Sequence, residues 1–173
     1  MDLAPYIRNV PDFPKPGIQF KDITTLLAST EAFSYVIDTW KKRYTGKSIT
    51  AIAATDARGF IFGGALAYAM QLPFVPVRKK GKLPSEKISA SFDLEYGSDC
   101  LELHVDALKA GDRVVLVDDL LATGGTMGAV AELVRQLGAE IVEVAFVIEL
   151  TGLNGRDKLE GVPVHSLVTF DCD

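Results

Sequence analysis

Short apolar runs alternate along the chain with stretches in which apolar residues recur at helical spacing. The run at 114–117 (Val-Val-Leu-Val) contains no polar residue, which is typical of a strand buried on both faces. Comparable runs predict further strands at 49–54, 74–77, 141–148 and 164–168, and helical spacing predicts helices at 33–44, 60–70 and 127–137. Strands that alternate with helices predict an α/β fold, in which a central, mainly parallel twisted sheet is flanked by helices.

Two segments depart from this alternation. Residues 1–27 contain four prolines, which exclude a long helix, so we predict a short helix followed by an ordered loop. Residues 78–87 are polar and residues 88–94 alternate in part, which predicts a hairpin or a mobile arm. Thr30 is the predicted N-terminal cap of the helix at 33–44.

Composition narrows the class of protein. The 173 residues, 48% of them hydrophobic, suffice for one domain with a substantial core, and no repeat or linker divides the chain. The formal net charge of -5 opposes a nucleic-acid partner, which usually requires a basic surplus. Cys100 and Cys172 are far apart and lack a C-x-x-C spacing. Their placement opposes a disulfide framework or a zinc site and favours a reducing compartment.

Nothing in the sequence predicts export or a membrane anchor. The first ten residues lack the apolar core of a signal peptide. No stretch approaches the roughly 18 apolar residues that a membrane helix requires. We therefore expect a soluble, cytoplasmic protein whose partners include neither a membrane nor nucleic acid.

The clearest chemical pattern follows the buried run at 114–117. Two acids, Asp118 and Asp119, come next, and the small-residue loop 122–126 (Ala-Thr-Gly-Gly-Thr) then opens a helix. The glycines permit positive φ and a close approach of backbone N–H groups, while the helix start adds unpaired N–H groups and the positive end of its dipole. This combination predicts a phosphate site. The acids cannot hold phosphate, but they suit ribose hydroxyls or a magnesium ion beside the phosphate.

Two other phosphate-binding motifs are not matched by the sequence. Gly46-Lys47-Ser48 matches the end of a P-loop, but Lys41 stands where its first glycine is required. The dinucleotide pattern G-x-G-x-x-G does not occur. Gly-Gly-Thr alone would indicate an ordinary strand-to-helix turn, so the phosphate prediction depends on the full string of strand, acid pair, loop and helix.

That string resembles the phosphoribosyl pyrophosphate signature of the type I phosphoribosyltransferases. Further segments resemble, in order and over nearly the whole chain, the members of this family that act on adenine. They are 13–23 (base-binding segment), 56–63 (pyrophosphate loop), 78–84 and 94–97 (two ends of a flexible catalytic loop), and 149–151 and 155–159 (C-terminal part). The resemblance implies the type I fold in a single domain over 1–173. It places a small N-terminal base-binding hood at 1–30, the flexible loop at 78–97 and the signature at 114–126.

The resemblance also implies an activity. A pentosyl (glycosyl) transferase of this kind moves the phosphoribosyl group of phosphoribosyl pyrophosphate to adenine and releases AMP and pyrophosphate, which is a reaction of purine salvage. Mg²⁺ would be the cofactor, bound mainly through substrate and near Asp118 and Asp119. The family further suggests a homodimer.

Roles for individual residues follow from the same resemblance on the phosphoribosyl side. Asp118 and Asp119 would hold the ribose 2- and 3-hydroxyls. The 5-phosphate would be enclosed by the loop, which consists of Ala122, Thr123, Gly124, Gly125 and Thr126. For the acid pair, the alternative is a solvated strand end.

On the leaving-group side, Arg58 would contact pyrophosphate, after a non-proline cis peptide expected at Asp56–Ala57. Lys79 and Lys82 would add positive charge from the flexible loop. The alternatives are an arginine in a surface turn and a basic run on a solvated face.

On the base side, Phe20 would stack on adenine, and backbone groups of Gln19 and Lys21 would contact its edge. Gln19 departs from the family, in which an aliphatic residue is commoner. Glu95 and Tyr96 would close over the reaction centre and would be catalytic together with Arg58. The alternatives are a core phenylalanine and a Glu95 that only positions the base.

Two rival functions remain open at this point. The base could be xanthine, hypoxanthine or orotate, since the phosphate loop does not select it; the Phe20 segment and the short C-terminus favour adenine. Alternatively, the chain could be a regulator that senses phosphoribosyl pyrophosphate and binds nucleic acid. The charge of -5 and the lack of an appended DNA-binding domain oppose that function.

Overall fold

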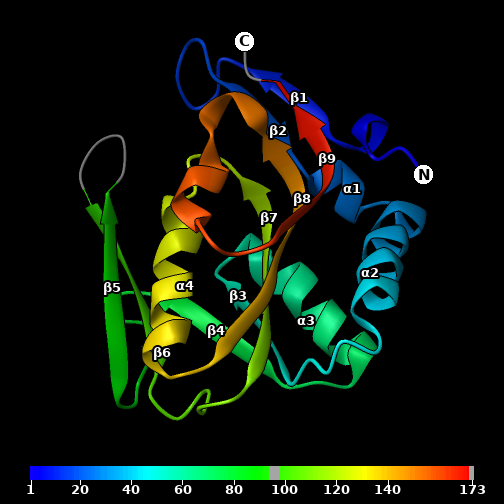
Figure 1. Ribbon diagram of the computed structural model, residues 1–173. Coiled ribbons are helices and arrows are strands. Elements are labelled where there is room, and N and C mark those ends of the chain that lie inside the picture. The colour runs from blue at the N-terminus through cyan, green and yellow to red at the C-terminus, as the bar shows by residue number, and fades with distance from the viewer. Residues whose placement is uncertain (94–97, 172–173) are drawn as a thin grey trace.

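The computed structural model describes residues 1–93 and 98–171, and it is built around one seven-stranded sheet in the order β5-β6-β4-β3-β7-β8-β9 (Figure 1). These strands are β3 (Ala51–Thr55), β4 (Phe74–Lys79), β5 (Lys87–Asp93), β6 (Ser98–His104), β7 (Arg113–Leu121), β8 (Glu140–Leu150) and β9 (Val164–Phe170). The helices are α1 (Thr24–Leu27), α2 (Thr30–Tyr44), α3 (Arg58–Met70) and α4 (Gly125–Gln136), with 3-10 turns η1 (Ala4–Tyr6), η2 (Thr151–Leu153) and η3 (Gly155–Leu159). Strands β4, β3, β7, β8 and β9 are parallel, whereas β5 and β6 are antiparallel. The predicted α/β class with a mainly parallel sheet is confirmed.

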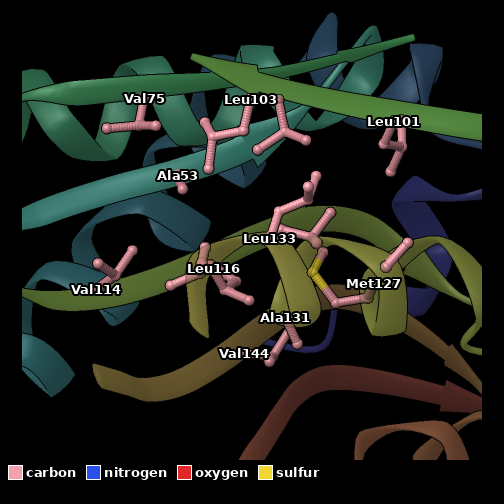
Figure 2. Packing of buried hydrophobic residues seen from close by; sticks show 14 of the residues in the cluster. Ala53, Val75, Leu101, Leu103, Val114, Leu116, Met127, Ala131, Leu133 and Val144 are labelled. Carbon is pink, nitrogen blue, oxygen red and sulfur yellow. The ribbon is translucent and has the colours of Figure 1, made fainter. Parts of the chain in front are cut away.

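The sheet separates two hydrophobic clusters. One joins α4 to the first face, and Figure 2 shows Met127 and Leu133 of α4 among Leu101, Leu103 and Leu116 of the strands. The other joins α2, α3 and the N-terminal segment to the second face. Because both faces are covered, the central strands contain wholly apolar runs at 51–54, 114–117 and 144–148, as their sequences predict.

The N-terminal segment forms a hood at the carboxyl ends of the parallel strands (Figure 1). The predicted ordered loop is wrong in part, because β1 (Arg8–Pro11) and β2 (Gln19–Asp22) pair as an antiparallel hairpin. Neither strand shows clear alternation, so the pairing depends on the partner strand rather than on local pattern. The Thr30 cap is also wrong: Ser29 is the cap of α2, and its hydroxyl accepts a hydrogen bond from the Ala32 amide at 3.2 Å.

The segment at 78–97 begins at the end of β4 and continues into β5. Strand β5 pairs with β6 from Lys87–His104 to Asp93–Ser98, so the hairpin alternative is confirmed for the described residues. The predicted catalytic residues Glu95 and Tyr96 lie in 94–97, outside the described residues. Mobility of this segment stays a prediction.

None of the helices within residues 1–93 and 98–171 is long and apolar enough to cross a membrane.

Candidate functional site

A cleft of about 830 Å³ opens at the carboxyl ends of β3, β4 and β7, where ligands bind in open α/β sheets. It brings together most of the predicted site residues, namely Arg58, Lys79, Lys82, Asp118, Asp119, Ala122, Thr123, Gly124, Gly125 and Thr126. Gln19, Phe20 and Lys21 of β2 are not in its lining. The residues predicted to contact the base therefore come from the N-terminal hairpin, and those predicted to hold the phosphoribosyl group come from β7, the loop after it and the start of α4.

The acid pair lies inside strand β7 rather than beyond it, because the strand runs on to Leu121. Asp119 is buried and Asp118 is partly buried, so the alternative of a solvated strand end is wrong. The Thr55 hydroxyl hydrogen-bonds Asp118, and the Asp119 amide donates to Asp118 Oδ1 at 2.9 Å. Burial, and next the Asp119 carboxylate, raise the pKa of Asp118 well above its ordinary range.

Helix α3 begins directly beside these acids. It starts at Arg58, two residues before the predicted start, and only the turn Asp56–Ala57 separates it from β3. That peptide bond is cis, as the resemblance predicted. A Cβ on Gly59 would lie 2.8 Å from Asp118 Oδ1, so only glycine allows the first turn of α3 to pack this closely on the acid pair.

Arg58 connects the acid pair with the hood. Its Nε lies 2.6 Å from Asp119 Oδ2, and its guanidinium carbon lies 5.8 Å from the centre of the Phe20 ring. The Arg58 side chain is half exposed in the cleft, whereas the Asp119 side chain is buried. The arrangement provides a cation that balances Asp119 and whose guanidinium can also donate hydrogen bonds to an anion.

The loop after β7 has the geometry of an anion site. Gly124, with φ of 81°, precedes α4, and no side chain caps this helix. The first N–H groups of a helix lack intrahelical acceptors, and the helix dipole is positive there. No acidic residue lies in the first turn of α4. The backbone at Gly125 and Thr126 can therefore donate to a phosphate group in the cleft.

Four further polar residues line the cleft, and the sequence predictions gave none of them a role: Thr55, Asp56, Arg78 and Asp99. Arg78 lies with its Nε 3.1 Å from Asp56 Oδ2, and Asp99 lies with its Oδ2 3.3 Å from Lys79 Nζ. Arg78 stands at the end of β4, next to β3, so the rule that ligands bind at strand ends could have found it. Asp99 could not have been found in this way, because strand β6 itself was not predicted.

On β2, the Phe20 side chain has different contacts from those of its sequence neighbours Gln19 and Lys21. Phe20 packs edge to face on Phe13, with ring centroids 5.2 Å apart. On β2, neighbouring side chains alternate in direction, and Gln19 and Lys21 both contact Asn9, at 2.7 and 2.9 Å. The unusual Gln19 side chain is thus bonded to Asn9.

Comparisons with known proteins agree with this geometry. A profile of the phosphoribosyl transferase domain family matches residues 23–167. A protein named adenine phosphoribosyltransferase from Clostridium botulinum is 53% identical over 171 residues, which are 99% of each chain. The crystal structure of adenine phosphoribosyltransferase from Thermoanaerobacter pseudethanolicus is 52% identical, with a TM-score of 0.93 over 97% of this chain and 98% of that one. The enzyme of that name from Saccharomyces cerevisiae, solved with adenine and an imino-altritol bisphosphate, is 42% identical, with a TM-score of 0.92 over 96% of both chains.

Proposed function

The chain belongs to the phosphoribosyl transferase family and, within it, to the adenine phosphoribosyltransferases, and from this membership we propose which of its residues carry out the reaction. The reaction transfers the phosphoribosyl group of phosphoribosyl pyrophosphate to adenine and releases AMP and pyrophosphate. One observation carries the assignment of roles: the acid pair of β7, the start of α4 and the start of α3 face one cleft.

The phosphoribosyl group is held between β7 and α4. The 5-phosphate accepts hydrogen bonds from the backbone at 122–126, and the carboxylates of Asp118 and Asp119 accept hydrogen bonds from the ribose hydroxyls. In the structure Asp119 already has a charged partner in Arg58. Binding of the substrate therefore places ribose and pyrophosphate on either side of an existing ion pair.

Magnesium fits this site as an ion shared with the substrate. Mg²⁺ prefers oxygen ligands and is usually held by one or two carboxylates together with substrate phosphates. Asp118 and Asp119 supply such carboxylates, while the described residues contain no group of three or more His, Cys, Asp or Glu side chains that could hold a metal by themselves. When bound, Mg²⁺ neutralises charge on the departing pyrophosphate.

The leaving group is bound by cations that line the same cleft. Adenine N9 forms the new bond to ribose C1 as the bond to pyrophosphate breaks, so negative charge accumulates on pyrophosphate oxygens. Arg58, Arg78, Lys79 and Lys82 line the cleft and stabilise this charge, and closure of 78–97 excludes water from the developing cation. Phe20 stacks on the base, and backbone groups of Gln19 and Lys21 contact its edge.

A base-selectivity assay tests this function. The purified chain, with phosphoribosyl pyrophosphate and Mg²⁺, is offered adenine, hypoxanthine, xanthine or orotate, and nucleotide formation is measured for each. We expect AMP from adenine and a kcat/KM for the other bases lower by at least about 100-fold, because their edges present the opposite donors and acceptors. Preferred use of another base, or nucleic-acid binding without any transfer, would overturn the proposal.

Arg58→Ala is expected to impair pyrophosphate binding more than AMP binding. A charge-assisted hydrogen bond contributes roughly 1.5–3 kcal/mol, so the pyrophosphate Kd should rise about 10- to 100-fold. AMP lacks the leaving group and should lose less affinity. Arg58→Lys is the matched variant: it keeps the charge near Asp119 and loses the fork of donors. Equal losses for both ligands in Arg58→Ala would contradict the role.

A homodimer is the assembly that the family suggests, and α3 offers a surface for it. Ile61 and Tyr68, two helical turns apart on α3, are 43% and 87% exposed. Large exposed apolar side chains that share one helix face are typical of protein interfaces. We expect light scattering to show a dimer for the natural chain and a monomer for Tyr68→Asp; a dimer in both would exclude this face.

A cytoplasmic location is proposed from the cysteine placement alone.

A further inference from the structure

The phosphate loop rests on a second backbone segment that no assigned role includes. A Cβ on Gly124 would lie 2.1 Å from the Gly155 carbonyl oxygen, and a Cβ on Gly155 would lie 2.2 Å from the Ala122 carbonyl oxygen. The two segments of the chain therefore touch backbone to backbone, which only paired glycines permit. Figure 1 shows this segment, with the 3-10 turn η3, beside the upper end of α4, and a Cβ on Gly128 would lie 3.3 Å from the Lys158 carbonyl oxygen.

Arg156, next to Gly155, connects η3 to the sheet through hydrogen bonds. Arg156 Nε and Nη2 donate to Glu149 Oε1 and Oε2, both at 2.6 Å, and Arg156 Nη1 donates to the Val164 carbonyl oxygen at 3.2 Å. Ser166 of β9 donates to Glu149 Oε2 at 2.6 Å. The Arg156 hydrogen bonds lower the pKa of Glu149, so it is ionised at neutral pH. Strands β8 and β9 thus determine where η3 lies.

The position of the phosphate loop depends on the segment packed against it, which is η3. No side chain caps α4, and the loop itself consists of small residues. Among the described residues, Arg156 is the side chain of η3 whose hydrogen bonds reach the sheet. A movement of η3 would move Gly155 and, through the backbone contact, Ala122 and Gly124. Misplacement of binding groups by about 1 Å can cost 100-fold in activity.

We propose that Arg156 and Glu149 are positioning residues for the phosphoribosyl group, because they hold Gly155 against the phosphate loop and so keep its N–H donors in place. The proposal deepens the proposed function and rests on the 5-phosphate binding at 122–126. According to the proposal, this ion pair affects the affinity for ligands that contain the 5-phosphate and does not affect the affinity for the base.

The same strand provides a matched control. Glu143 of β8 forms an equivalent fork with Arg43 of α2, at 2.6 and 2.7 Å, and Tyr44 donates to it at 2.8 Å. The Glu143 side chain is 7% exposed and that of Glu149 is 8% exposed, so the two glutamates are similarly buried. Six residues of strand, about 20 Å, separate the two glutamates. The Arg43 pair contributes nothing to the lining of the cleft.

The test compares Arg156→Lys with Arg43→Lys. Each variant keeps the charge and loses the fork, and the readouts are the dissociation constants of AMP and of adenosine, which lacks the 5-phosphate. In Arg156→Lys we expect the AMP Kd to rise about 10- to 100-fold and the adenosine Kd to stay within about twofold. In Arg43→Lys we expect neither to change. Equal weakening of AMP by both variants, or equal weakening of AMP and adenosine by Arg156→Lys, would overturn the proposal.

A second variant avoids dependence on the stability of the ion pair. Gly155 does not have a positive φ, so in Gly155→Ala the added methyl acts through its clash with the Ala122 carbonyl oxygen and the Leu121 side chain, at the start of the phosphate loop. We expect the same selective loss of AMP affinity, and natural AMP affinity in this variant would overturn the proposal. Binding is measured without turnover, so the two proposals can fail separately. A selective loss of AMP affinity in a chain that transfers no base would support the positioning role of Arg156 and Glu149 and would refute the proposed reaction.

Discussion

Replacement of both Asp118 and Asp119 by asparagine is expected to lower kcat/KM for phosphoribosyl pyrophosphate by about 10²–10⁴-fold. Each charge-assisted hydrogen bond to a ribose hydroxyl or to Mg²⁺ contributes roughly 1.5–3 kcal/mol, and each 1.4 kcal/mol is a factor of ten. Asparagine retains the shape and one acceptor oxygen but not the negative charge. The loss should therefore appear in catalysis and in magnesium dependence.

The double variant should remain folded. Burial and the Asp119 carboxylate raise the pKa of Asp118, so ionisation of Asp118 opposes folding as the pH rises above the ordinary pKa of an aspartate. A neutral side chain removes that cost. Loss of Asp119 leaves Arg58 without its partner, but the Arg58 side chain is half exposed and can be solvated. The midpoint of thermal unfolding at neutral pH should therefore be no lower than that of the natural chain.

Initial rates with varied phosphoribosyl pyrophosphate and Mg²⁺ measure the first effect, and circular dichroism on heating measures the second. Asp112→Asn is the control, because Asp112 lies at the opposite end of β7 and accepts a hydrogen bond from Thr50 at 2.9 Å. It loses a carboxylate without touching the cleft. Turnover near the natural rate in the double variant would remove the acid pair from the mechanism.

Glu95→Gln is expected to lower kcat by about 10²–10⁴-fold, the usual contribution of a general base. Glu95 lies outside the described residues, and its role comes from the family resemblance. The described residues on either side of 94–97 lie at the cleft: Asp93 pairs with Ser98, and Phe92 and Asp99 line the cleft. If adenine binds as the N7-protonated tautomer, N9 is free to attack, and a carboxylate beside N7 accepts the proton as charge leaves the ring.

Single-turnover kinetics separate this role from simple positioning. A general base requires a slower chemical step in Glu95→Gln with little change in adenine affinity, since glutamine keeps the shape and the hydrogen bond. A residue that only positions the base would raise the adenine KM and leave the single-turnover rate almost unchanged. Glu86→Gln, an exposed acid just before β5, is the matched control.

The sequence by itself determined the parts of this protein that depend on neighbouring residues. Apolar runs located the central parallel strands, and helical spacing located α2, α3 and α4 to within a few residues. The loop at 122–126 was found for the same reason, because its glycines and the helix behind it act through local backbone geometry. Family resemblance added the cis peptide at Asp56–Ala57, which the structure confirms.

Only the tertiary structure decided which distant residues meet. It paired the proline-rich N-terminus into a hairpin, placed Asp119 against Arg58, and set Gly155 against Gly124 with Arg156 behind it. Such contacts depend on sheet order and on the path of the chain between elements. Local periodicity contains neither, because the same pattern of strands and helices is compatible with several arrangements in space.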